Sequence, residues 1–217
     1  MTADLFADDE HAHAWREDLG PGAVVLRGFA LAQQAAIFAA LRDITAAAPF
    51  RHMVTPGGFR MSVAITNCGG LGWVSDRRGY RYGGIDPDRG KPWPRMPELF
   101  LGLVREAAAQ AGFPDFEPDA CLINRYEPGA RLSLHQDKNE QDFSQPIVSV
   151  SLGVSAVFLF GGERREDKAM RVPLAHGDVV VWGGPARLRY HGVLPLKENE
   201  HAATGSHRIN LTFRKAG

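Results

Sequence analysis

The chain contains the stretch PIVSVSLGVSAVFLFGG at residues 146–162. In its first half valine and leucine alternate with serine, and its second half is an apolar run that ends in two glycines. Alternation with a period of two is the pattern of a β-strand, and paired glycines commonly form turns. This stretch therefore predicts two successive strands.

Six further runs of this kind lie on both sides of the pair, and turn residues such as proline and glycine separate them. In chain order the eight runs are CLINRYE, RLSLHQD, IVSVSLG, AVFLFGG, RVPLAHGD, VVVWGG, YHGVLPL and HRINLTFR. Short strands at such close spacing are typical of a sandwich or jelly roll, and they argue against a parallel βαβ sheet. We expect a jelly-roll core over residues 119–217.

Two helices are predicted in the first half of the chain. The segment 31–48 is rich in alanine, leucine and glutamine, has apolar residues near a 3.6-residue period, and is followed by Pro49. The segment 97–111 begins with a proline and is followed by Gly112. We expect both helices to cover one face of the sheet, so that residues 1–217 form a single, mainly β domain with flanking helices.

The composition is that of a globular domain with balanced charge. The 217 residues include 25 lysines and arginines and 25 aspartates and glutamates, which excludes a protein that coats nucleic acid or membranes by overall basicity. Cys68 and Cys121 show no CxxC spacing, no secretory signal is visible, and no apolar run approaches the roughly 18 residues of a membrane span. We therefore expect a cytoplasmic monomer with no membrane partner and with free, buried thiols.

A candidate metal site lies at the end of the second predicted strand of the core. His135 and Asp137 are two residues apart, so on an extended chain both side chains point to the same face. A second histidine would complete a 2-His-1-carboxylate set, which is typical of non-haem Fe(II) oxygen chemistry. Of the histidines that follow in the chain, His191 is the best placed, because it lies in an apolar run. The pattern also allows two alternatives to Fe(II) chemistry, a zinc site and a cupin-like binding role.

A candidate site for an anionic cosubstrate lies near the end of the chain. Arg208, Asn210, Thr212 and Arg214 share one face of the predicted strand. If that face is buried, two guanidinium groups and an amide point into one cavity, which suits a dicarboxylate. The alternative is the solvated outer face of an edge strand. Asn124 and Tyr126 form a second such pair and could close the same cavity, or could belong to an ordinary polar face.

The segment 51–95, ahead of the core, is basic and rich in aromatic residues. It contains eight lysines and arginines against three aspartates. Its aromatic residues are Phe59, Trp73, Tyr80, Tyr82 and Trp93. Aromatic side chains interleaved with arginine favour the stacking of bases and the binding of phosphates. The alternative is a loop cover whose aromatic residues fill a small core of their own.

Together these patterns resemble the AlkB family of Fe(II)- and 2-oxoglutarate-dependent nucleic-acid dealkylases, and the match is close to the family's bacterial member. The resemblance extends from about residue 5 to residue 216. The stretches that carry it are MVTPGG at 53–58, DACLINRY at 119–126, LSLHQDK at 132–138, PIVSVSLG at 146–153, HGDVVVWGG at 176–184 and NLTFR at 210–214. The implied fold is a double-stranded β-helix, that is a jelly-roll dioxygenase core, with an N-terminal nucleotide-recognition lid at residues 50–96.

The resemblance also implies a role for each residue of the site. The implied iron ligands, which are also the implied catalytic residues, are His135, Asp137 and His191. The implied 2-oxoglutarate ligands are Asn124, Tyr126, Arg208, Asn210 and Arg214, with Arg208 at the distal carboxylate and Arg214 at the end that chelates the metal. The implied substrate residues are Thr55, Met61, Trp73, Tyr80, Arg81, Tyr82, Asn139 and Arg165, with Trp73 and the His135 ring on the two faces of a flipped base.

The implied reaction is the oxidative dealkylation of N1-methyladenine and N3-methylcytosine, with O2 as second cosubstrate and formaldehyde, succinate and CO2 as products. The implied partner is alkylated single-stranded DNA, with double-stranded DNA and RNA as further candidates. Two alternatives are a 2-oxoglutarate oxygenase that acts on a protein or metabolite, and a non-catalytic, metal-dependent nucleic-acid-binding module. The aromatic and basic segment argues against the first, and the full set of ligands argues against the second.

Four positions depart from the pattern of the bacterial family member. Asn139 stands where that protein has an acid, Phe59 and Ile65 replace a tyrosine and a methionine, and Arg189 replaces an aromatic residue beside the distal histidine. An asparagine keeps an acceptor oxygen but loses the negative charge. We therefore expect base preference and rate to differ from the pattern, and Arg189 to alter the surroundings of the metal.

Overall fold

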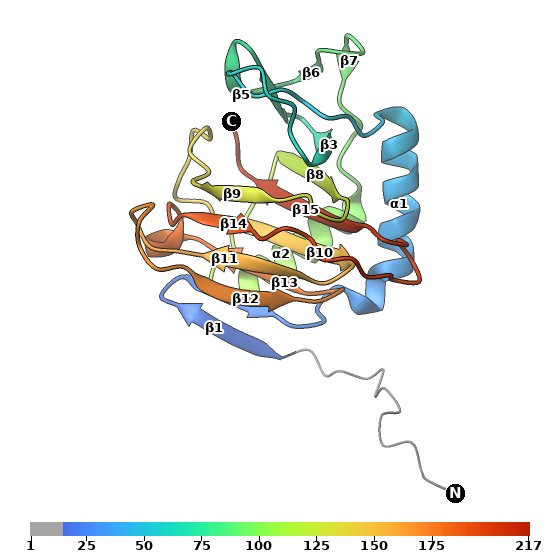
Figure 1. Ribbon diagram of the computed structural model, residues 1–217. Coiled ribbons are helices and arrows are strands. Elements are labelled where there is room, and N and C mark those ends of the chain that lie inside the picture. Colours follow the sequence, from blue (N-terminus) through green and yellow to red (C-terminus); the bar gives the residue numbers. More distant parts are fainter. Residues whose placement is uncertain (1–14) are drawn as a thin grey trace, which may run out of the picture.

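In the computed structural model, which describes residues 15–217, two antiparallel β-sheets face each other (Figure 1). The larger sheet has seven strands in the order β1-β2-β13-β10-β15-β8-β3. Their bounds are Arg16–Gly20 for β1, Ala23–Leu26 for β2, Ala64–Gly69 for β3, Ala120–Tyr126 for β8, Ile147–Gly153 for β10, Val179–Trp182 for β13 and Arg208–Arg214 for β15. Residues 1–14 of the predicted single domain lie outside the described part.

The smaller sheet has four strands in the order β12-β11-β14-β9. Their bounds are Leu132–His135 for β9, Ala156–Phe160 for β11, Met170–Leu174 for β12 and His191–Val193 for β14. The strands β8 to β15 match the eight predicted runs, one strand to each run, and only β8 and β12 begin one residue before their run. The prediction of a mainly β jelly roll is therefore confirmed.

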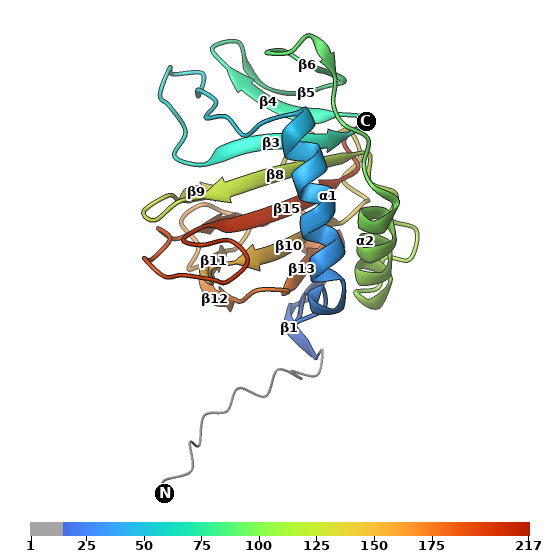
Figure 2. The same cartoon turned by 90° about the vertical axis from the view of Figure 1, so that its right-hand side faces the viewer.

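Both long helices pack on the outer face of the larger sheet, as predicted (Figure 2). Helix α1 spans Gln34–Ala47 and is preceded by a short 3-10 helix, η1, at Leu31–Gln33; α2 spans Glu98–Gln110, and a second 3-10 helix, η2, spans Gly184–Ala186. Phe100 of α2 meets Phe213 of β15 edge to face, with ring centroids 5.8 Å apart. Because the helices and the sheet exclude water from each other, this layer buries a continuous apolar core.

Strand β15 separates the helix-side core from the space between the sheets. Leu211 and Phe213 are fully buried in the core under the helices. The alternate residues Arg208, Asn210, Thr212 and Arg214 line the cavity between the sheets. Since β15 lies between β10 and β8 in the middle of the larger sheet, the alternative of a solvated edge strand is wrong.

The segment 51–95 contains two small hairpins that lie beyond the β3 edge of the larger sheet (Figure 1). In the first hairpin β4, Gly72–Asp76, pairs with β5, Gly79–Gly83; in the second, β6, Ile85–Asp86, pairs with β7, Lys91–Pro92. The Asn67 side chain fixes the first hairpin to β3, because it accepts a hydrogen bond from the Trp73 N–H at 3.0 Å and donates one to the Trp73 carbonyl at 3.0 Å.

The alternation of the stretch FRMSVAITN predicts a strand at 59–67, but β3 instead begins at Ala64. The residues before it form a turn, in which the Thr55 N–H donates to the Phe59 carbonyl at 2.8 Å and the Met61 N–H donates to the Met53 carbonyl at 2.9 Å. Local pairing across this turn uses the backbone groups that a longer β3 would need. No helix within residues 15–217 has the length and apolar character required to cross a membrane.

Candidate metal centre and cosubstrate pocket

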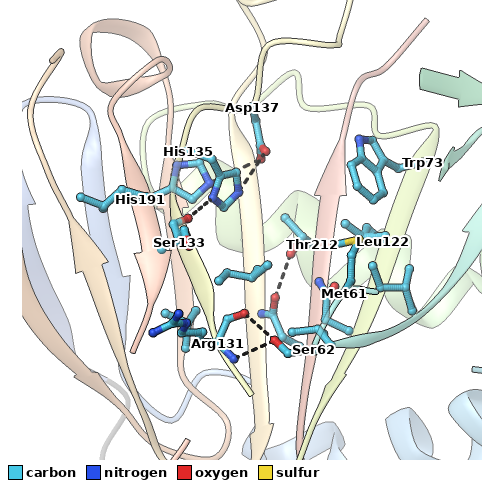
Figure 3. Close-up of a pocket in the computed structure, with 18 of the residues that line it drawn as sticks. Met61, Ser62, Trp73, Leu122, Arg131, Ser133, His135, Asp137, His191 and Thr212 are labelled. Atoms are coloured by element: carbon cyan, nitrogen blue, oxygen red, sulfur yellow. Dashed lines mark hydrogen bonds and ion pairs between the residues drawn. The ribbon is translucent and has the colours of Figure 1, made fainter. Parts of the chain in front are cut away.

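Two neighbouring strands of the smaller sheet bring the predicted metal ligands together. In the antiparallel pairing of β9 with β14, His135 lies directly opposite His191. Asp137 follows two residues after His135, and the ligand atoms of the three side chains all lie within 4.8 Å of one another. Figure 3 shows both imidazoles pointing toward the Asp137 carboxylate. Four histidines follow Asp137 in the chain, namely His176, His191, His201 and His207. The sheet register selects His191 among them.

Each imidazole is oriented by a backbone carbonyl. The Nδ1 of His135 lies 2.8 Å from the Ser133 carbonyl, and the Nδ1 of His191 lies 3.1 Å from the Arg189 carbonyl. A carbonyl only accepts, so each Nδ1 carries the proton, and each Nε2 presents its lone pair to the shared centre. Both Nε2 atoms lie 3.7 Å from a carboxylate oxygen of Asp137.

The charge states of the ligands suit a divalent metal. Burial and the neighbouring His191 lower the pKa of His135 to about 4, so this imidazole is neutral at neutral pH. Burial alone would raise the pKa of Asp137, but Arg214 and the two imidazoles outweigh it and hold that pKa well below its usual range. Two imidazoles and one carboxylate on one side of a centre form the 2-His-1-carboxylate set that binds Fe(II) and leaves positions open.

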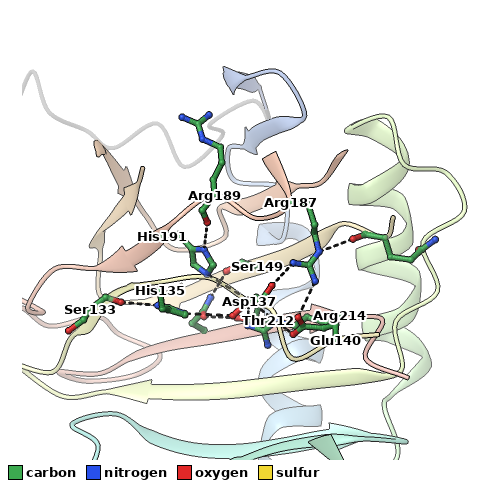
Figure 4. Close-up of polar contacts among 12 residues, drawn as sticks. Ser133, His135, Asp137, Glu140, Ser149, Arg187, Arg189, His191, Thr212 and Arg214 are labelled. Atoms are coloured by element: carbon green, nitrogen blue, oxygen red, sulfur yellow. Dashed lines mark hydrogen bonds and ion pairs between the residues drawn. The ribbon is translucent and has the colours of Figure 1, made fainter. Parts of the chain in front are cut away.

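Arg214 is the counter-ion of this carboxylate. Its Nε and Nη2 donate to Oδ2 of Asp137 at 2.8 and 2.5 Å (Figure 4). Burial disfavours the guanidinium, but the attraction of Asp137 outweighs it and raises the pKa of Arg214. The predicted face of β15 thus reaches the metal ligands directly.

Arg208, at the other end of the same face, has a different environment. Its guanidinium is buried, lies 5.0 Å above the Tyr126 ring and donates to Ser151 Oγ at 3.0 Å. Its Nε and Nη1 have no hydrogen-bond partner among the described residues, and the same holds for the hydroxyl of Tyr126. Burial lowers the pKa of Arg208, because no carboxylate of residues 15–217 compensates its charge. A buried, uncompensated guanidinium calls for an anionic ligand, and the distal carboxylate of 2-oxoglutarate fits this requirement.

One cavity of about 630 Å³ joins the two arginines, the metal ligands and the outer hairpin. Asn124, Tyr126 and Asn210 line its inner part, together with Ser149 and Trp182, which the sequence patterns did not identify. Ser149 Oγ accepts a hydrogen bond from Asn210 Nδ2 at 2.8 Å. The alternation of serine along β10 was the signal that could have identified Ser149 and Ser151.

At the mouth of the cavity two aromatic rings stack on each other. The Trp73 and Tyr80 rings have centroids 5.5 Å apart at an interplanar angle of 15°. Thr55, Met61, Asn139 and Arg165 also line the cavity, as do Phe59 and Ile65. Asn139 is exposed, and Arg165 donates to the Leu134 carbonyl at 2.5 Å. Figure 3 shows Trp73 across the cavity from Asp137.

Two of the predicted substrate residues lie elsewhere. Arg81 donates to Asp76 at 2.7 and 2.9 Å within the hairpin, and it does not line the cavity. Tyr82 turns beneath the hairpin and donates to Glu140 Oε1 at 2.6 Å. The Arg189 side chain lies against Phe160 and donates to the Gly161 carbonyl at 2.6 Å, so only its backbone carbonyl contacts His191.

Comparisons with known proteins agree with this geometry. The family described as the 2OG-Fe(II) oxygenase superfamily matches residues 22–214. The chain is 58% identical over 214 residues to the alpha-ketoglutarate-dependent dioxygenase AlkB of Escherichia coli, covering 99% of this chain and 98% of that protein. It is 35% identical over 174 residues to the DNA N(6)-methyladenine demethylase ALKBH1C of Arabidopsis thaliana, covering 68% of this chain and 38% of that protein. The solved structure of OsALKBH1 superposes with a TM-score of 0.80 at 31% identity, over 93% of this chain and 100% of that one.

The metal centre makes a direct prediction for Asp137→Ala. This change removes the only anionic ligand among the three clustered side chains and leaves Arg214 without its main counter-ion, so the affinity for Fe(II) or Mn(II) should fall by at least about 100-fold. Titration of the apoprotein with Mn(II), with the free ion followed by electron paramagnetic resonance, measures this loss. Asp142→Ala, a change of a partly exposed aspartate in the following loop, is the matched control. An unchanged affinity in Asp137→Ala would refute the metal site.

Proposed function

The chain belongs to the 2OG-Fe(II) oxygenase superfamily and, within it, to the AlkB family of dioxygenases, and from this premise we propose that it repairs N-alkylated bases of nucleic acid by oxidative dealkylation. The enzyme is a dioxygenase that uses Fe(II), 2-oxoglutarate and O2. The favoured substrates are N1-methyladenine and N3-methylcytosine. The products are the repaired base, formaldehyde, succinate and CO2.

The observation that carries this proposal is the single cavity that joins the metal ligands to an aromatic mouth. The three ligand atoms lie inside it, and Trp73 and Tyr80 stand at its opening. Aromatic side chains provide stacking surfaces for a base, and a base must leave its helix to reach a buried centre. The name of the Arabidopsis relative, a DNA N(6)-methyladenine demethylase, supports a nucleic-acid substrate.

In the proposed site each end of the 2-oxoglutarate molecule has its own arginine. Arg208 holds the distal carboxylate, and Arg214 lies at the end that chelates the metal beside Asp137. Asn124, Tyr126 and Asn210 complete the cosubstrate site. His135, Asp137 and His191 hold Fe(II), which when bound supplies the O2 chemistry that oxidises 2-oxoglutarate to succinate and CO2 and hydroxylates the N-alkyl carbon. Loss of formaldehyde from the hydroxylated group then restores the base.

The proposed substrate residues belong to the mouth of the cavity. Trp73 and the His135 ring stack on the two faces of the flipped base, and Thr55, Met61, Asn139 and Arg165 line the space around it. Tyr80 at the mouth holds the backbone and the base edge, and Arg81 and Tyr82, which lie outside the cavity, support the hairpin that carries Tyr80. The lid at residues 50–96 and the core at 119–217 act as one unit of a single domain.

We further propose a preference for single-stranded DNA, a monomeric state and a cytoplasmic location. A single strand avoids the free-energy cost of unpairing and unstacking the base, which supports the preference for single-stranded DNA. The free, buried thiols of Cys68 and Cys121 suit a reducing compartment, which supports the cytoplasmic location. Double-stranded DNA and RNA are the further substrates to be tested.

Mass spectrometry of methylated oligonucleotides tests the proposed function. N1-methyladenine and N3-methylcytosine are offered in single-stranded DNA, double-stranded DNA and RNA, with Fe(II), 2-oxoglutarate and O2. We expect each demethylated base to lose one CH2 group, about 14 mass units, with equal amounts of succinate and formaldehyde formed. Asp137→Ala should show no loss of mass. Turnover of 2-oxoglutarate with no demethylation of any base would instead favour a protein or metabolite as substrate.

The cosubstrate site predicts the effect of changes at Arg208. Arg208→Met removes the buried guanidinium, so the KM for 2-oxoglutarate should rise by about 10- to 100-fold, the worth of a charge-assisted hydrogen bond. Arg208→Lys should recover only part of this loss, because an ammonium cannot make the bidentate contact. Initial rates of succinate formation measure both variants, with Arg171→Met on the exposed part of β12 as control. An unchanged KM in Arg208→Met would contradict the assignment.

The position of the exposed Asn139 at the cavity predicts faster demethylation of N1-methyladenine by Asn139→Asp. N1-methyladenine carries a positive charge, whereas arginines outnumber carboxylates along the cavity, so an added carboxylate at the mouth should attract this base. We expect demethylation of N1-methyladenine to become about two- to five-fold faster, a size set by the exposure of the site. Asn199→Asp adds the same charge on a distant exposed loop and should change nothing. Equal rates in Asn139→Asp and the unaltered enzyme would show that the charge is dispensable.

A further inference from the structure

A buried carboxylate lies behind the metal centre, outside the cavity. The Glu140 side chain is only 2% exposed, although the loop around it, from Lys138 to Ser144, is mostly exposed. A buried carboxylate is costly unless charged or hydrogen-bonding partners compensate it. Glu140 has three such partners, and they come from three different parts of the chain. Figure 4 shows two of them, Arg187 and Arg214.

The first partner, Arg187, holds the loop that carries the metal carboxylate. It lies just after η2 and is buried. Its Nη2 donates to Glu140 Oε2 at 3.2 Å, its Nη1 to the Asp137 carbonyl at 2.9 Å, and its Nε to the Gln145 carbonyl at 3.0 Å. One guanidinium thus fixes the loop at three points, and the charge of Glu140 keeps that guanidinium in place.

The second partner, Arg214, is the counter-ion of the metal ligand itself. Its Nε lies 3.5 Å from Glu140 Oε1 and 2.8 Å from Asp137 Oδ2. A metal ion at Asp137 competes with Arg214 for that carboxylate. Glu140 then supplies the second negative charge that keeps the buried guanidinium compensated.

The third partner, Tyr82, belongs to the hairpin above the cavity. It lies on β5, directly opposite Trp73 of β4, and its hydroxyl donates to Glu140 Oε1 at 2.6 Å. Burial raises the pKa of Tyr82, and the nearby Glu140 carboxylate adds to that rise, so the phenol stays protonated and able to donate. The hairpin that carries the Trp73–Tyr80 stack is thereby attached to the same carboxylate as the metal-ligand loop.

We propose that Glu140 is a positioning residue that connects the nucleotide-binding hairpin to the metal centre. One oxygen holds Tyr82 of the hairpin, and the other holds Arg187 and through it the loop of Asp137. The position of Trp73 and Tyr80 over the cavity and the position of Asp137 at the metal are therefore set by one group. The part of this inference that concerns oligonucleotides rests on the proposed function, whereas the part that concerns the metal does not.

Two binding measurements on four proteins test this role: the unaltered chain, Glu140→Gln, Tyr82→Phe and the double variant. Mn(II) affinity is measured by electron paramagnetic resonance, and the affinity for a fluorescent N1-methyladenine oligonucleotide by anisotropy with Mn(II) and 2-oxoglutarate present. Glu140→Gln keeps the shape but loses the charge, so Mn(II) affinity should fall by about 10- to 100-fold. Tyr82→Phe should lower oligonucleotide affinity by about 10-fold, with a much smaller effect on Mn(II).

The double variant gives the decisive comparison. A phenol donates a weaker hydrogen bond to a neutral amide than to a carboxylate, so the cost of Tyr82→Phe should shrink at least about threefold in the Glu140→Gln background. If the fold-losses of oligonucleotide affinity in the two single variants simply multiply in the double variant, the connection is overturned. A Mn(II) affinity of Glu140→Gln within twofold of the unaltered chain would also overturn it. A lower melting temperature with both affinities unchanged would make Glu140 a packing residue and would also overturn it.

Matched controls separate this role from loss of a group elsewhere. Glu127→Gln removes an exposed carboxylate that pairs with Arg125, and Tyr190→Phe removes another tyrosine hydroxyl. Both changes should leave the two affinities unchanged. If Glu140→Gln does not fold, Arg187→Lys tests the same connection to the metal-ligand loop, because one ammonium cannot bind the three oxygens that Arg187 binds. Mn(II) affinity should again fall about 10-fold. An unchanged Mn(II) affinity would overturn the role of Glu140. An unaltered enzyme that neither binds nor demethylates the oligonucleotide refutes the proposed function, and the Mn(II) titrations still decide the role of Glu140.

Discussion

The burial of two arginines on one central strand is the constraint on which the site depends. Arg208 and Arg214 share a face of β15, and because that strand lies between β10 and β8, neither guanidinium can reach bulk water. A buried positive charge must be compensated. Asp137 compensates Arg214, whereas no carboxylate among residues 15–217 compensates Arg208. The buried charge is thus compensated at the metal end of the cavity, whereas the buried guanidinium at the other end calls for an anionic ligand.

The division of each strand into two faces explains how one sheet serves both stability and chemistry. The outward face of β15 carries Leu211 and Phe213, which pack under the helices, and this dry layer fixes the strand in place. The inward face is polar and lines the cavity. The helices therefore act on the site only through the sheet, by holding rigid the strands from which the ligands project. The aromatic hairpin lies outside both layers and is attached to them by Asn67 and Glu140.

Much of this arrangement could be predicted from residue patterns, and the exceptions have physical causes. Period-two alternation identified the strands from β8 to β15 and the inward face of β15, because strand geometry alone sets which residues share a face. The start of β3 was missed, since a local turn at Thr55 competes for its backbone groups. The inward turn of Tyr82 was missed as well. Its cause is the burial of Glu140, which lies 58 residues further along the chain, and no local pattern encodes that distance.

The sequence by itself determined that the chain forms a jelly roll with two covering helices, and it placed a histidine and a carboxylate two residues apart at the end of one strand. It also supplied the aromatic and basic residues ahead of the core. The apolar run around His191 made it the best-placed partner, and the tertiary structure brought it to the site, because the pairing of β9 with β14 sets His191 opposite His135. The tertiary structure alone showed that no carboxylate among residues 15–217 compensates Arg208 and that Glu140 has three partners. Periodicity reports the face of a residue, whereas charge compensation depends on which distant residues share that buried space.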